Sequence, residues 1–397
     1  MLKIMSVNAG SSSLKFKLFE MPAETVITEG IIERIGMQDA GVTFKYNGEK
    51  KSKVLPIKNH EEAVKILLDL LIKQNIVTSL DEINGVGHRV LHGGEVYAKS
   101  VVFDDDVERV VDEMKVLGPL HNPHNLTGYR AFKAALPNVG NVAIFDTAFH
   151  QTMPADRYMY PIPYDYYKQF GIRRYGFHGT SHLYVSGRCI ELLGNPAHSN
   201  IITAHIGNGA SLAAVRDGKC ENTSMGLTPL AGVEMGTRSG DIDPAVVTFL
   251  SEKLHVSAEE VISILNKKSG LLGVSGVSSD SRDICKAIEE GNERALLARK
   301  IQVETVVNYV GQYYVELGHV DALVFTAGIG ENDTIFRAEV CKMLEEPLGI
   351  KIDLELNKAR GKEVMISTPE SKIKVYVIPT DEELVIARDT VKLLKLI

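Results

Sequence analysis

The chain has 397 residues, of which 44% are hydrophobic and 24% charged, and its formal net charge is −7 at pH 7. This length exceeds what one hydrophobic core usually organises, so two domains are expected. The negative net charge argues against nucleic acid or an anionic membrane as the main partner. It does not exclude an anionic small molecule, because a site for one needs only a local cluster of arginines.

No targeting or membrane segment is expected. Residues 1–8 become polar too early to contain the apolar region of a signal peptide. The apolar runs are short, and the helical one at residues 63–72 is interrupted by Lys65 and Asp69, so no membrane span is expected. The four cysteines lie far apart without a CxxC pair, which argues against a zinc site or a disulfide framework and favours a reducing cytoplasm. They are Cys189, Cys220, Cys285 and Cys341.

Strand and helix signals alternate along the chain, which favours a mixed α/β architecture. Residues 4–8 and 14–19 are predicted strands joined by a small-residue turn, and residues 60–74 are a predicted helix. Further short apolar runs predict buried strands at residues 142–145, 201–205, 322–326 and 374–378. Each strand leads into a polar or glycine-bearing stretch, where α/β proteins tend to collect their sites.

The chain contains one internal similarity, between residues 4–14 and 201–212. Both segments consist of a strand, a polar residue, a small-residue turn and a second strand that opens Ser-Leu. A duplication is therefore predicted, in which two such turns hold phosphates through backbone N–H groups and hydroxyls. The Pro- and Tyr-rich residues 154–167 are the expected boundary, with an N-terminal domain over 1–150 and a C-terminal domain over 151–383. The last helix, from about residue 384 to 397, is expected to pack with the N-terminal domain.

In the first half, two stretches carry groups suited to anions. The turn at residues 8–13, followed by Lys15, combines backbone donors, hydroxyls and a cation, although a serine-rich hairpin turn explains the same residues. Arg89 lies between His88 and His92 in a glycine-rich stretch. The two histidines lack the glutamate of a zincin motif, so hydrogen-bonded structural roles are favoured for them and an anion-binding role for Arg89.

In the second half, His178 and Arg238 each lie among small residues. The pattern is consistent with a side chain that only stabilises a turn or loop, and equally with an anion site. Residues 328–332 follow a predicted strand, and their glycines would let a nucleotide approach the backbone. Neither a Walker A motif nor GxGxxG is present, so P-loop and Rossmann folds are excluded. Thr380 and Glu383 have the spacing of a capping box, which explains Glu383 but not Glu382.

Taken together, these segments resemble the acetate kinase family in order along nearly the whole chain. The matching motifs lie at residues 8–15 (NAGSSSLK), 87–89 (GHR), 119–123 (PLHNP), 145–150 (FDTAFH), 175–182 (YGFHGTSH), 205–209 (HIGNG), 236–241 (GTRSGD) and 328–332 (GIGEN). The resemblance implies a duplicated actin-like ATPase fold of the sugar kinase, Hsp70 and actin superfamily, with two domains around a cleft. It also implies a homodimer that transfers the ATP γ-phosphoryl group reversibly to acetate, giving acetyl phosphate and ADP.

The resemblance also implies roles for individual residues. Asn8 and Glu382 would belong to a Mg²⁺ site, with Mn²⁺ as an alternative ion, and Lys15 would contact the nucleotide phosphates. Arg89 and Arg238 would bind the carboxylate and the transferring phosphoryl group, while His178 would stabilise the transition state. Asp146 would be catalytic, and orientation of Arg89 or of a metal-bound water is favoured over proton transfer. The acyl pocket would comprise Leu91, Leu120, Phe177 and Pro229. The ATP site would comprise His205, Ile206, Gly207, Asn208, Gly209, Asp280, Ser281, Arg282, Gly328, Ile329, Gly330, Glu331 and Asn332.

This sequence departs from the family pattern at four of these positions or close to them. Leu91 stands where the family commonly has valine, which bears on acyl-chain preference, and Asp381 replaces the usual asparagine beside Glu382. Ala231 and Glu234 also differ from the pattern. A propionate or butyrate kinase with the same machinery is the main alternative function. An actin-like ATP-binding module that is not a kinase is a further alternative. It would not need Arg89 and Arg238 both facing the γ-phosphate, nor an apolar pocket beside them.

Overall fold

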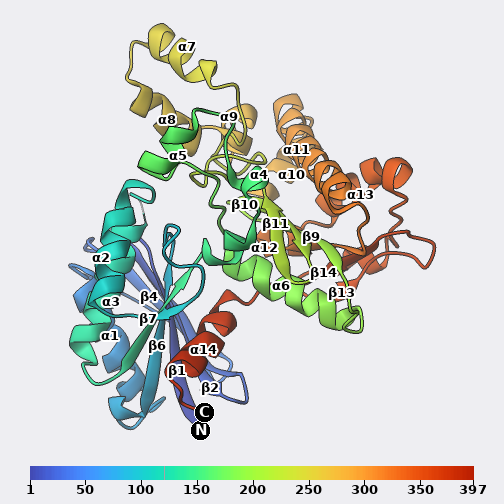
Figure 1. Cartoon of the computed structure of the whole chain (residues 1–397). Helices are drawn as coiled ribbons and strands as arrows, with labels where there is room; N and C mark the ends of the chain where they lie inside the picture. Colours follow the sequence, from blue (N-terminus) through green and yellow to red (C-terminus); the bar gives the residue numbers. More distant parts are fainter. Residues whose placement is uncertain (120) are drawn as a thin grey trace. The chain divides into compact units, whose positions relative to one another are not determined.

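The computed structural model describes residues 1–119 and 121–397, and they form two compact units (Figure 1). The first unit comprises Met1–Ala148 and Asp381–Ile397, and the second comprises Phe149–Thr380. Among the described residues, no helix is both long and apolar enough to cross a bilayer.

The first unit is built on an eight-stranded sheet with the order β5-β4-β3-β2-β1-β6-β8-β7. Its strands are β1 (Leu2–Ala9), β2 (Ser13–Met21), β3 (Thr25–Glu33), β4 (Ala40–Tyr46), β5 (Glu49–Leu55), β6 (Ile83–Val90), β7 (Val101–Val102) and β8 (Gly140–Phe145). Its helices are α1 (His60–Lys73), α2 (Asp105–Glu113), α3 (Asn122–Ala135) and α14 (Glu382–Leu393). Figure 1 shows α1, α2 and α3 on one side of this sheet and α14 on the other.

The last helix packs closely onto the first sheet. Helix α14 contacts β1, β6 and β8, and Ile386 packs with Val142 and Ile144 of β8. Glycine in β6 permits the approach, because a Cβ on Gly87 would lie 2.4 Å from atoms of both Ile386 and Thr390. The chain therefore returns to its N-terminal unit after completing the second one.

The second unit contains a six-stranded sheet with the order β11-β10-β9-β12-β14-β13. Its strands are β9 (Asn200–Ile206), β10 (Ala210–Arg216), β11 (Lys219–Thr223), β12 (Ala322–Thr326), β13 (Val364–Met365) and β14 (Lys374–Val377). Its helices are α4 (Ala155–Tyr158), α5 (Tyr164–Phe170), α6 (Gly179–Leu192), α7 (Ala245–Leu254), α8 (Ala258–Lys267), α9 (Gly270–Ser275), α10 (Ser281–Glu289), α11 (Glu293–Leu317), α12 (Ala327–Asn332) and α13 (Thr334–Leu348). Helix α6 packs on β9 and β12, and α11 packs on β9 and β10.

The two sheets share one strand arrangement. In the first unit, β1 pairs antiparallel with β2 and parallel with β6, which in turn pairs parallel with β8. In the second unit, β9 pairs antiparallel with β10 and parallel with β12, which pairs parallel with β14. This repetition confirms the duplication predicted from residues 4–14 and 201–212. The predicted strands and the helix at residues 60–74 are also present, with boundaries that differ by a few residues.

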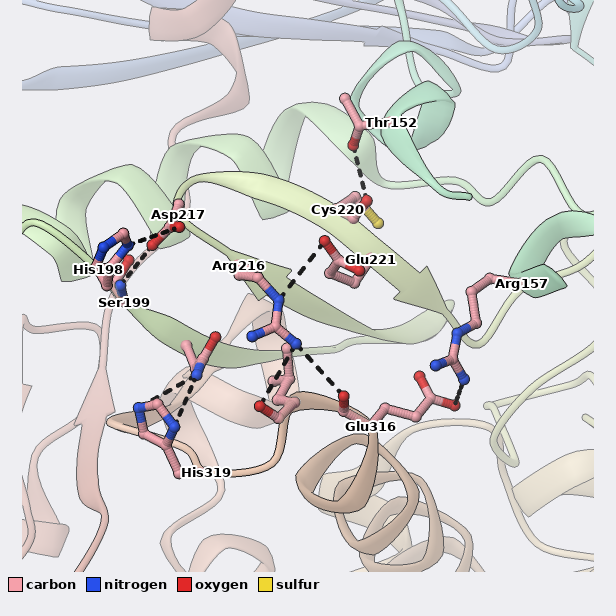
Figure 2. Close-up of polar contacts among 12 residues, drawn as sticks. Thr152, Arg157, His198, Ser199, Arg216, Asp217, Cys220, Glu221, Glu316 and His319 are labelled. Atoms are coloured by element: carbon pink, nitrogen blue, oxygen red, sulfur yellow. Dashed lines mark hydrogen bonds and ion pairs between the residues drawn. The ribbon is translucent and has the colours of Figure 1, made fainter. Parts of the chain in front are cut away.

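Polar contacts tie one end of the β9–β10 hairpin to neighbouring segments (Figure 2). Arg157 Nη1 lies 3.2 Å from Glu316 Oε1 of α11, and the Ser199 amide donates to Asp217 Oδ1 at 2.7 Å. Arg216 is paired in register with Asn200, so this cluster lies at the opposite end of the hairpin from the turn at residues 207–209. Its contacts are therefore structural.

Candidate active site

Strand alternation brings predicted site residues of the first unit to the sheet face that α14 covers. Successive side chains of a strand point to opposite faces. Met5, Val7 and Leu14 lie in the core that includes α1 residues. Asn8 and Lys15, which are cross-strand neighbours, therefore lie on the α14 face.

The parallel strands β6 and β8 continue this face. Gly87 of β6 faces α14, so Arg89, two residues later, lies on the same side. Ile144 of β8 also contacts α14, and Asp146 follows two residues after it. Asn8, Arg89 and Asp146 thus lie at the carboxyl ends of three neighbouring parallel strands, where α/β sheets commonly bind ligands.

Arg89 and Asp146 form a bidentate ion pair. Arg89 Nε donates to Asp146 Oδ1 at 2.9 Å, and Nη2 donates to Oδ2 at 2.6 Å. Asp146 is fully buried, whereas the Arg89 side chain is 24% exposed. Burial alone would lower the pKa of Arg89, but the charge of Asp146 outweighs it and raises that pKa above its usual value. Asp146 therefore fixes the guanidinium, and both of its oxygens are engaged in doing so.

The capping box predicted for Thr380 and Glu383 is wrong. Asp381 is the N-cap of α14, because its side chain accepts from the Leu384 amide at 3.2 Å. An aspartate in front of a helix satisfies a free amide of the first turn as well as threonine does. Thr380 lies one residue too early to cap.

Glu383 instead pairs with the two lysines of β2. It forms an ion pair with Lys15 and lies 3.4 Å from Lys17 Nζ, which also lies 3.2 Å from Asp381 Oδ1. Burial alone would raise the pKa of Glu383, but Lys15 and Lys17 outweigh it and lower that pKa. The two lysines thus neutralise the carboxylates on either side of Glu382.

Glu382 has a different environment from its neighbours. Within residues 1–119 and 121–397 it has no hydrogen-bond or ion-pair partner. Burial and the nearby charges of Asp146 and Glu383 raise its pKa, while Arg89 and Lys15 oppose the shift. A partly buried carboxylate without a direct counter-ion fits a divalent cation, for which carboxylate and amide oxygens are ordinary ligands.

A metal bound by protein side chains alone does not fit this structure. Across the described part of the chain, no group of three or more His, Cys, Asp or Glu side chains could hold a metal. Asn8 and Glu382 would supply two oxygens on the α14 face. The donor set therefore fits a magnesium-type ion that takes its remaining oxygens from phosphate and water.

Leu91 is the predicted acyl-pocket residue of the first unit. It follows β6 directly and is 6% exposed. Its amide donates to Asn125 Oδ1 at 3.0 Å, and Asn125 Nδ2 donates to the Ala9 carbonyl at 2.9 Å. Asn125 therefore ties the Leu91 backbone to the end of β1. Leu120 lies outside the described residues, and Phe177 and Pro229 belong to the second unit.

His88 and His92 have structural environments. His88 Nε2 lies 2.8 Å from Asn141 Oδ1, and its ring packs edge-on against Tyr129. His92 Nδ1 accepts from the Gly94 amide at 3.0 Å. Burial lowers the pKa of each histidine to about 4. The structural role favoured from the sequence is confirmed for this pair.

In the second unit, His178 is held by hydroxyl and ring contacts. It precedes α6 in a left-handed conformation with φ of 58°, and its Nδ1 lies 2.9 Å from Ser211 Oγ of β10. Its ring stacks on His205 with a centroid separation of 4.1 Å, and His205 Nδ1 lies 2.8 Å from Ser181 Oγ. These contacts fix the orientation of the His178 ring.

Arg238 borders the same turn as His178. A Cβ on Gly209 would lie 3.4 Å from His178 Nε2 and 3.5 Å from Arg238 Nη1. Arg238 Nη1 donates to the Pro229 carbonyl at 3.2 Å, and the guanidinium has no carboxylate partner among the described residues. Burial lowers its pKa. Arg238 is therefore a partly buried cation whose environment favours an incoming anion.

A cavity of about 670 Å³ in the second unit is lined by Gly207 and Asn208 of the same turn. The predicted nucleotide residues that line it are Gly207, Asn208, Asp280, Ser281, Arg282, Gly328, Ile329 and Asn332. The predicted residues that do not line it are His205, Ile206, Gly209, Gly330 and Glu331. Glu331 Oε1 instead accepts from the Ala327 amide at 2.9 Å and from the Thr380 amide at 3.2 Å.

Sequence reasoning missed part of this cavity. The additional lining residues are Ser279, Cys285, Glu289, Asp333, Thr334, Ile335 and Arg360. Asp333 caps α13 by accepting from the Phe336 amide at 2.9 Å, so a capping signal at Asp333-Thr334 could have located that wall. Cys285, Glu289 and Arg360 carry no local signal of this kind.

Comparison with known proteins supports the resemblance to the acetate kinase family along nearly the whole chain. The chain matches the acetokinase family over residues 3–388. The acetate kinase of Geobacillus kaustophilus (strain HTA426) is 57% identical over 397 residues, which cover 100% of both chains. The chain belongs to the acetokinase family.

Solved structures of related kinases have the same fold as this chain. The crystal structure of Porphyromonas gingivalis acetate kinase matches with a TM-score of 0.94 and 48% identity, covering 99% of this chain and 100% of that one. A propionate kinase from Francisella tularensis subsp. tularensis SCHU S4 matches with a TM-score of 0.94 and 40% identity, with the same coverage. The predicted family resemblance is confirmed, and so is the duplicated α/β fold, whose strand arrangement is repeated in the two units.

The loop that carries Arg238 also contains a buried acid. Glu234 is 2% exposed, and neither carboxylate oxygen has a hydrogen-bond partner among the described residues. Its amide donates to Thr305 Oγ1 of α11 at 3.2 Å, which fixes the backbone there. Burial raises the pKa of Glu234 to about 8. The side chain is therefore mostly protonated in the folded chain at neutral pH.

We expect Glu234→Gln to stabilise the protein increasingly as pH rises from 5 to 8. In this window the unfolded chain releases the Glu234 proton while the folded chain retains it, so native stability falls by up to about 1.4 kcal/mol per pH unit. Glutamine has no ionisable proton, so this loss of stability is absent from the variant. The measurement is the melting temperature of both proteins across pH 5–8.5, with Glu346→Gln, an exposed glutamate of α13, as the control. Parallel curves for Glu234→Gln and the native protein would contradict the assignment.

Proposed function

We propose that this chain is an acetate kinase, which transfers the γ-phosphoryl group of ATP reversibly to acetate and produces acetyl phosphate and ADP. The observation that carries this proposal is Arg238, a partly buried guanidinium without a carboxylate partner among the described residues, beside His178 and next to a cavity of nucleotide size. Full-length identity of 57% to a protein named acetate kinase gives independent support.

The proposed chemistry needs positive charge more than it needs a base. A carboxylate has a pKa near 4 and is already ionised at neutral pH. The barrier comes from bringing this anion onto a polyanionic phosphate chain. In the proposed step an acetate oxygen forms a bond to the γ-phosphorus, while the bond to the β,γ-bridging oxygen breaks and ADP leaves with the electron pair. Arg89, Arg238 and His178 would stabilise the charge on the transferring group, and Lys15 that on the nucleotide phosphates.

Asp146 acts in this proposal as a positioning residue for Arg89. Both of its oxygens accept from the guanidinium, and it is fully buried. An aspartate occupied in this way is poorly suited to exchange protons with a substrate. The geometry supports orientation of Arg89, and direct in-line transfer without a phosphoenzyme is part of the proposal.

Magnesium, or manganese in its place, is the proposed cofactor. Asn8 and Glu382 would hold the ion, and when bound it would neutralise charge on the nucleotide phosphates. Glu382 would be available because Lys15 and Lys17 occupy the carboxylates on either side of it. The Glu382 carboxylate would thus interact with the ion and not with a lysine.

The cavity of the second unit is the proposed nucleotide site. Backbone at Gly207 and Gly328 borders it, so phosphates could approach without side-chain obstruction. The other predicted nucleotide residues would lie behind this wall and shape its backbone. They are His205, Ile206, Gly209, Gly330 and Glu331. ATP, ADP, acetate and acetyl phosphate are therefore the proposed small-molecule partners.

Domain roles, assembly and location complete the proposal. The first unit would be the N-terminal domain, with α14 packed on it, and the second unit the nucleotide-binding C-terminal domain. A homodimer is supported by exposed apolar side chains of the second unit, including Tyr164, Phe170 and Phe249, which are 57%, 62% and 60% exposed. A cytoplasmic location is supported by four free cysteines, three of them buried.

Propionate kinase is the second candidate function. The Francisella propionate kinase is as close in fold as the Porphyromonas acetate kinase, although less similar in sequence. Both activities would use the same charged groups, so acyl-chain length would separate them. A side-by-side assay of acetyl and propionyl phosphate formation decides between the two.

Replacing either arginine with alanine should reduce kcat by about 10²-fold or more, because each removes charge stabilisation at the transition state. For Arg89→Ala, the buried Asp146 would also lose its partner, so the melting temperature of this variant should fall as well. Arg238→Ala leaves no such acid behind and should remain stable. Acyl phosphate formation and thermal unfolding measure both effects. Near-normal kcat in either variant would remove that arginine from the mechanism.

Glu382→Ala and Glu383→Ala should have different effects. Loss of Glu382 should weaken Mn²⁺ binding, measured by electron paramagnetic resonance without turnover, and raise the Mg²⁺ concentration for half-maximal activity about tenfold or more. Loss of Glu383 should cost about 1 kcal/mol of stability, because it breaks ion pairs with Lys15 and Lys17, and should leave ion binding close to native. If Glu383→Ala produced the metal defect instead, the two roles would be reversed.

Leu91→Val should improve propionate use relative to acetate. Removing one methylene from the proposed acyl pocket adds room for a longer chain, an effect of roughly 1–3 kcal/mol at most. Because Asn125 holds the Leu91 backbone, the pocket cannot easily shift to cancel the change, although side chains can still repack. We expect about a tenfold change in the ratio of kcat/KM values for propionate and acetate. An unchanged ratio would mean that Leu91 does not face the acyl group.

A further inference from the structure

A second cavity of the C-terminal unit has no role in the proposed chemistry. It is a groove between α11, α13 and residues 354–358, and it encloses about 850 Å³, within the range of small-molecule sites. Apolar side chains form much of its wall. Three of them, Ile335, Met343 and Leu354, are 52%, 43% and 64% exposed.

Charged side chains also line the groove. Its cationic lining residues are Arg299, Lys300, Lys342 and Lys358, and its anionic ones are Glu304 and Glu339. Lys342 and Lys358 are paired with Glu345 and Glu355, each at 2.7 Å. Lys300 and the donors of Arg299 that Asp333 does not occupy therefore remain to complement a ligand that has an apolar body and an acidic group. A neutral apolar molecule would provide no acceptor for these donors.

Arg299 has unused hydrogen-bond donors at this groove. The residue is 2% exposed, and its Nη2 donates to Ser281 Oγ at 3.0 Å and to Asp333 Oδ2 at 2.7 Å. Its Nε and Nη1 have no hydrogen-bond partner within the described part of the chain. Nη1 lies 3.8 Å from Glu339 Oε2, too far for a hydrogen bond, and that oxygen also lacks a partner. Buried donors are normally satisfied, so this arrangement points to an acceptor that the chain itself does not provide.

We propose that the groove between α11 and α13 is a binding site for a small amphipathic organic anion. The apolar body of the ligand would lie against Ile335, Met343 and Leu354. Its acidic group would replace Glu339 as the acceptor for Arg299. The Glu339 side chain is 40% exposed, so it can turn toward water when it is displaced.

Occupancy of the groove should affect the nucleotide cavity, a consequence that rests on the proposed function. Thr334 and Ile335 line both cavities. Arg299 also holds Ser281 and Asp333, which line the nucleotide cavity. An anion that draws Arg299 toward the groove loosens those bonds. The anion and the nucleotide then weaken each other's binding by the same factor, because coupling between two sites is reciprocal.

The test uses 8-anilinonaphthalene-1-sulfonate as the probe and the full chain as the protein. Probe fluorescence should saturate at one site that persists when MgATP is saturating, and its affinity should fall severalfold under that condition. The uncharged analogue N-phenyl-1-naphthylamine should bind more weakly, because it cannot supply an acceptor to Arg299. These readouts need no catalysis, so a failed kinase proposal would not alter the result for the site itself.

Two variants should move the affinity in opposite directions. Met343→Asp places a carboxylate on the apolar wall and should weaken probe binding about fivefold or more. Glu339→Gln removes the competing carboxylate and should strengthen binding about threefold. Met37→Asp makes the same methionine substitution at a 50% exposed position of the first unit and should leave probe binding unchanged.

Three results would overturn the proposed site. They are complete displacement of the probe by MgATP, equal affinity for the charged and uncharged probes, and unchanged affinity in both Met343→Asp and Glu339→Gln. An unchanged MgADP affinity when the probe is bound would overturn the coupling. Circular dichroism of each variant checks that these surface changes leave the fold intact.

Discussion

The arrangement of the candidate site depends on where parallel strands end. In each unit an antiparallel hairpin is followed by two parallel strands, so three carboxyl ends meet at one edge of the sheet. Side-chain alternation then decides which residues at that edge share a face. In the first unit this places Asn8, Arg89 and Asp146 on the face that α14 covers. A shift of one residue in any of these strands would turn its site residue toward the opposite core.

The two arginines of the proposed mechanism differ in electrostatic environment. Arg89 has a buried carboxylate partner that raises its pKa and fixes its direction, whereas Arg238 is held by a backbone carbonyl and its pKa is lowered by burial. A paired arginine is rigid but partly neutralised. An unpaired one keeps its full charge for an anion, at a cost in desolvation. In the proposed mechanism the first arginine would supply orientation and the second attraction, which are the two needs of phosphoryl transfer.

Much of the fold could be predicted from the sequence, because buried strands and the α1 helix have periodic patterns that local residues set. The duplication was also visible, since turn chemistry is local. The pairing of charged side chains, in contrast, could not be predicted from the sequence. Thr380 and Glu383 fitted a capping box, yet Asp381 satisfies the same helix end, and Glu383 is drawn to Lys15 and Lys17 across more than 360 positions of chain. Only the folded sheet brings those lysines to α14. The walls of the proposed nucleotide cavity at Cys285 and Arg360 likewise come from segments with no shared local signal.

Two residues at the edge of the second sheet hold a strained backbone. His178 and Ala327 both have left-handed conformations, with φ of 58° and 65°, which cost non-glycine residues roughly 1 kcal/mol or more. Each is held by a side-chain partner: Ser211 bonds the His178 ring, and Glu331 accepts from the Ala327 amide. The position of Glu331 behind the cavity wall is explained in this way, because its carboxylate secures the turn into Gly328. Strain at Ala327 therefore directs the backbone of residues 327–329 toward the cavity, and strain at His178 directs an imidazole toward Gly209. The local cost persists because the hydrogen bonds that offset it are partly buried, where they are worth more than at the surface.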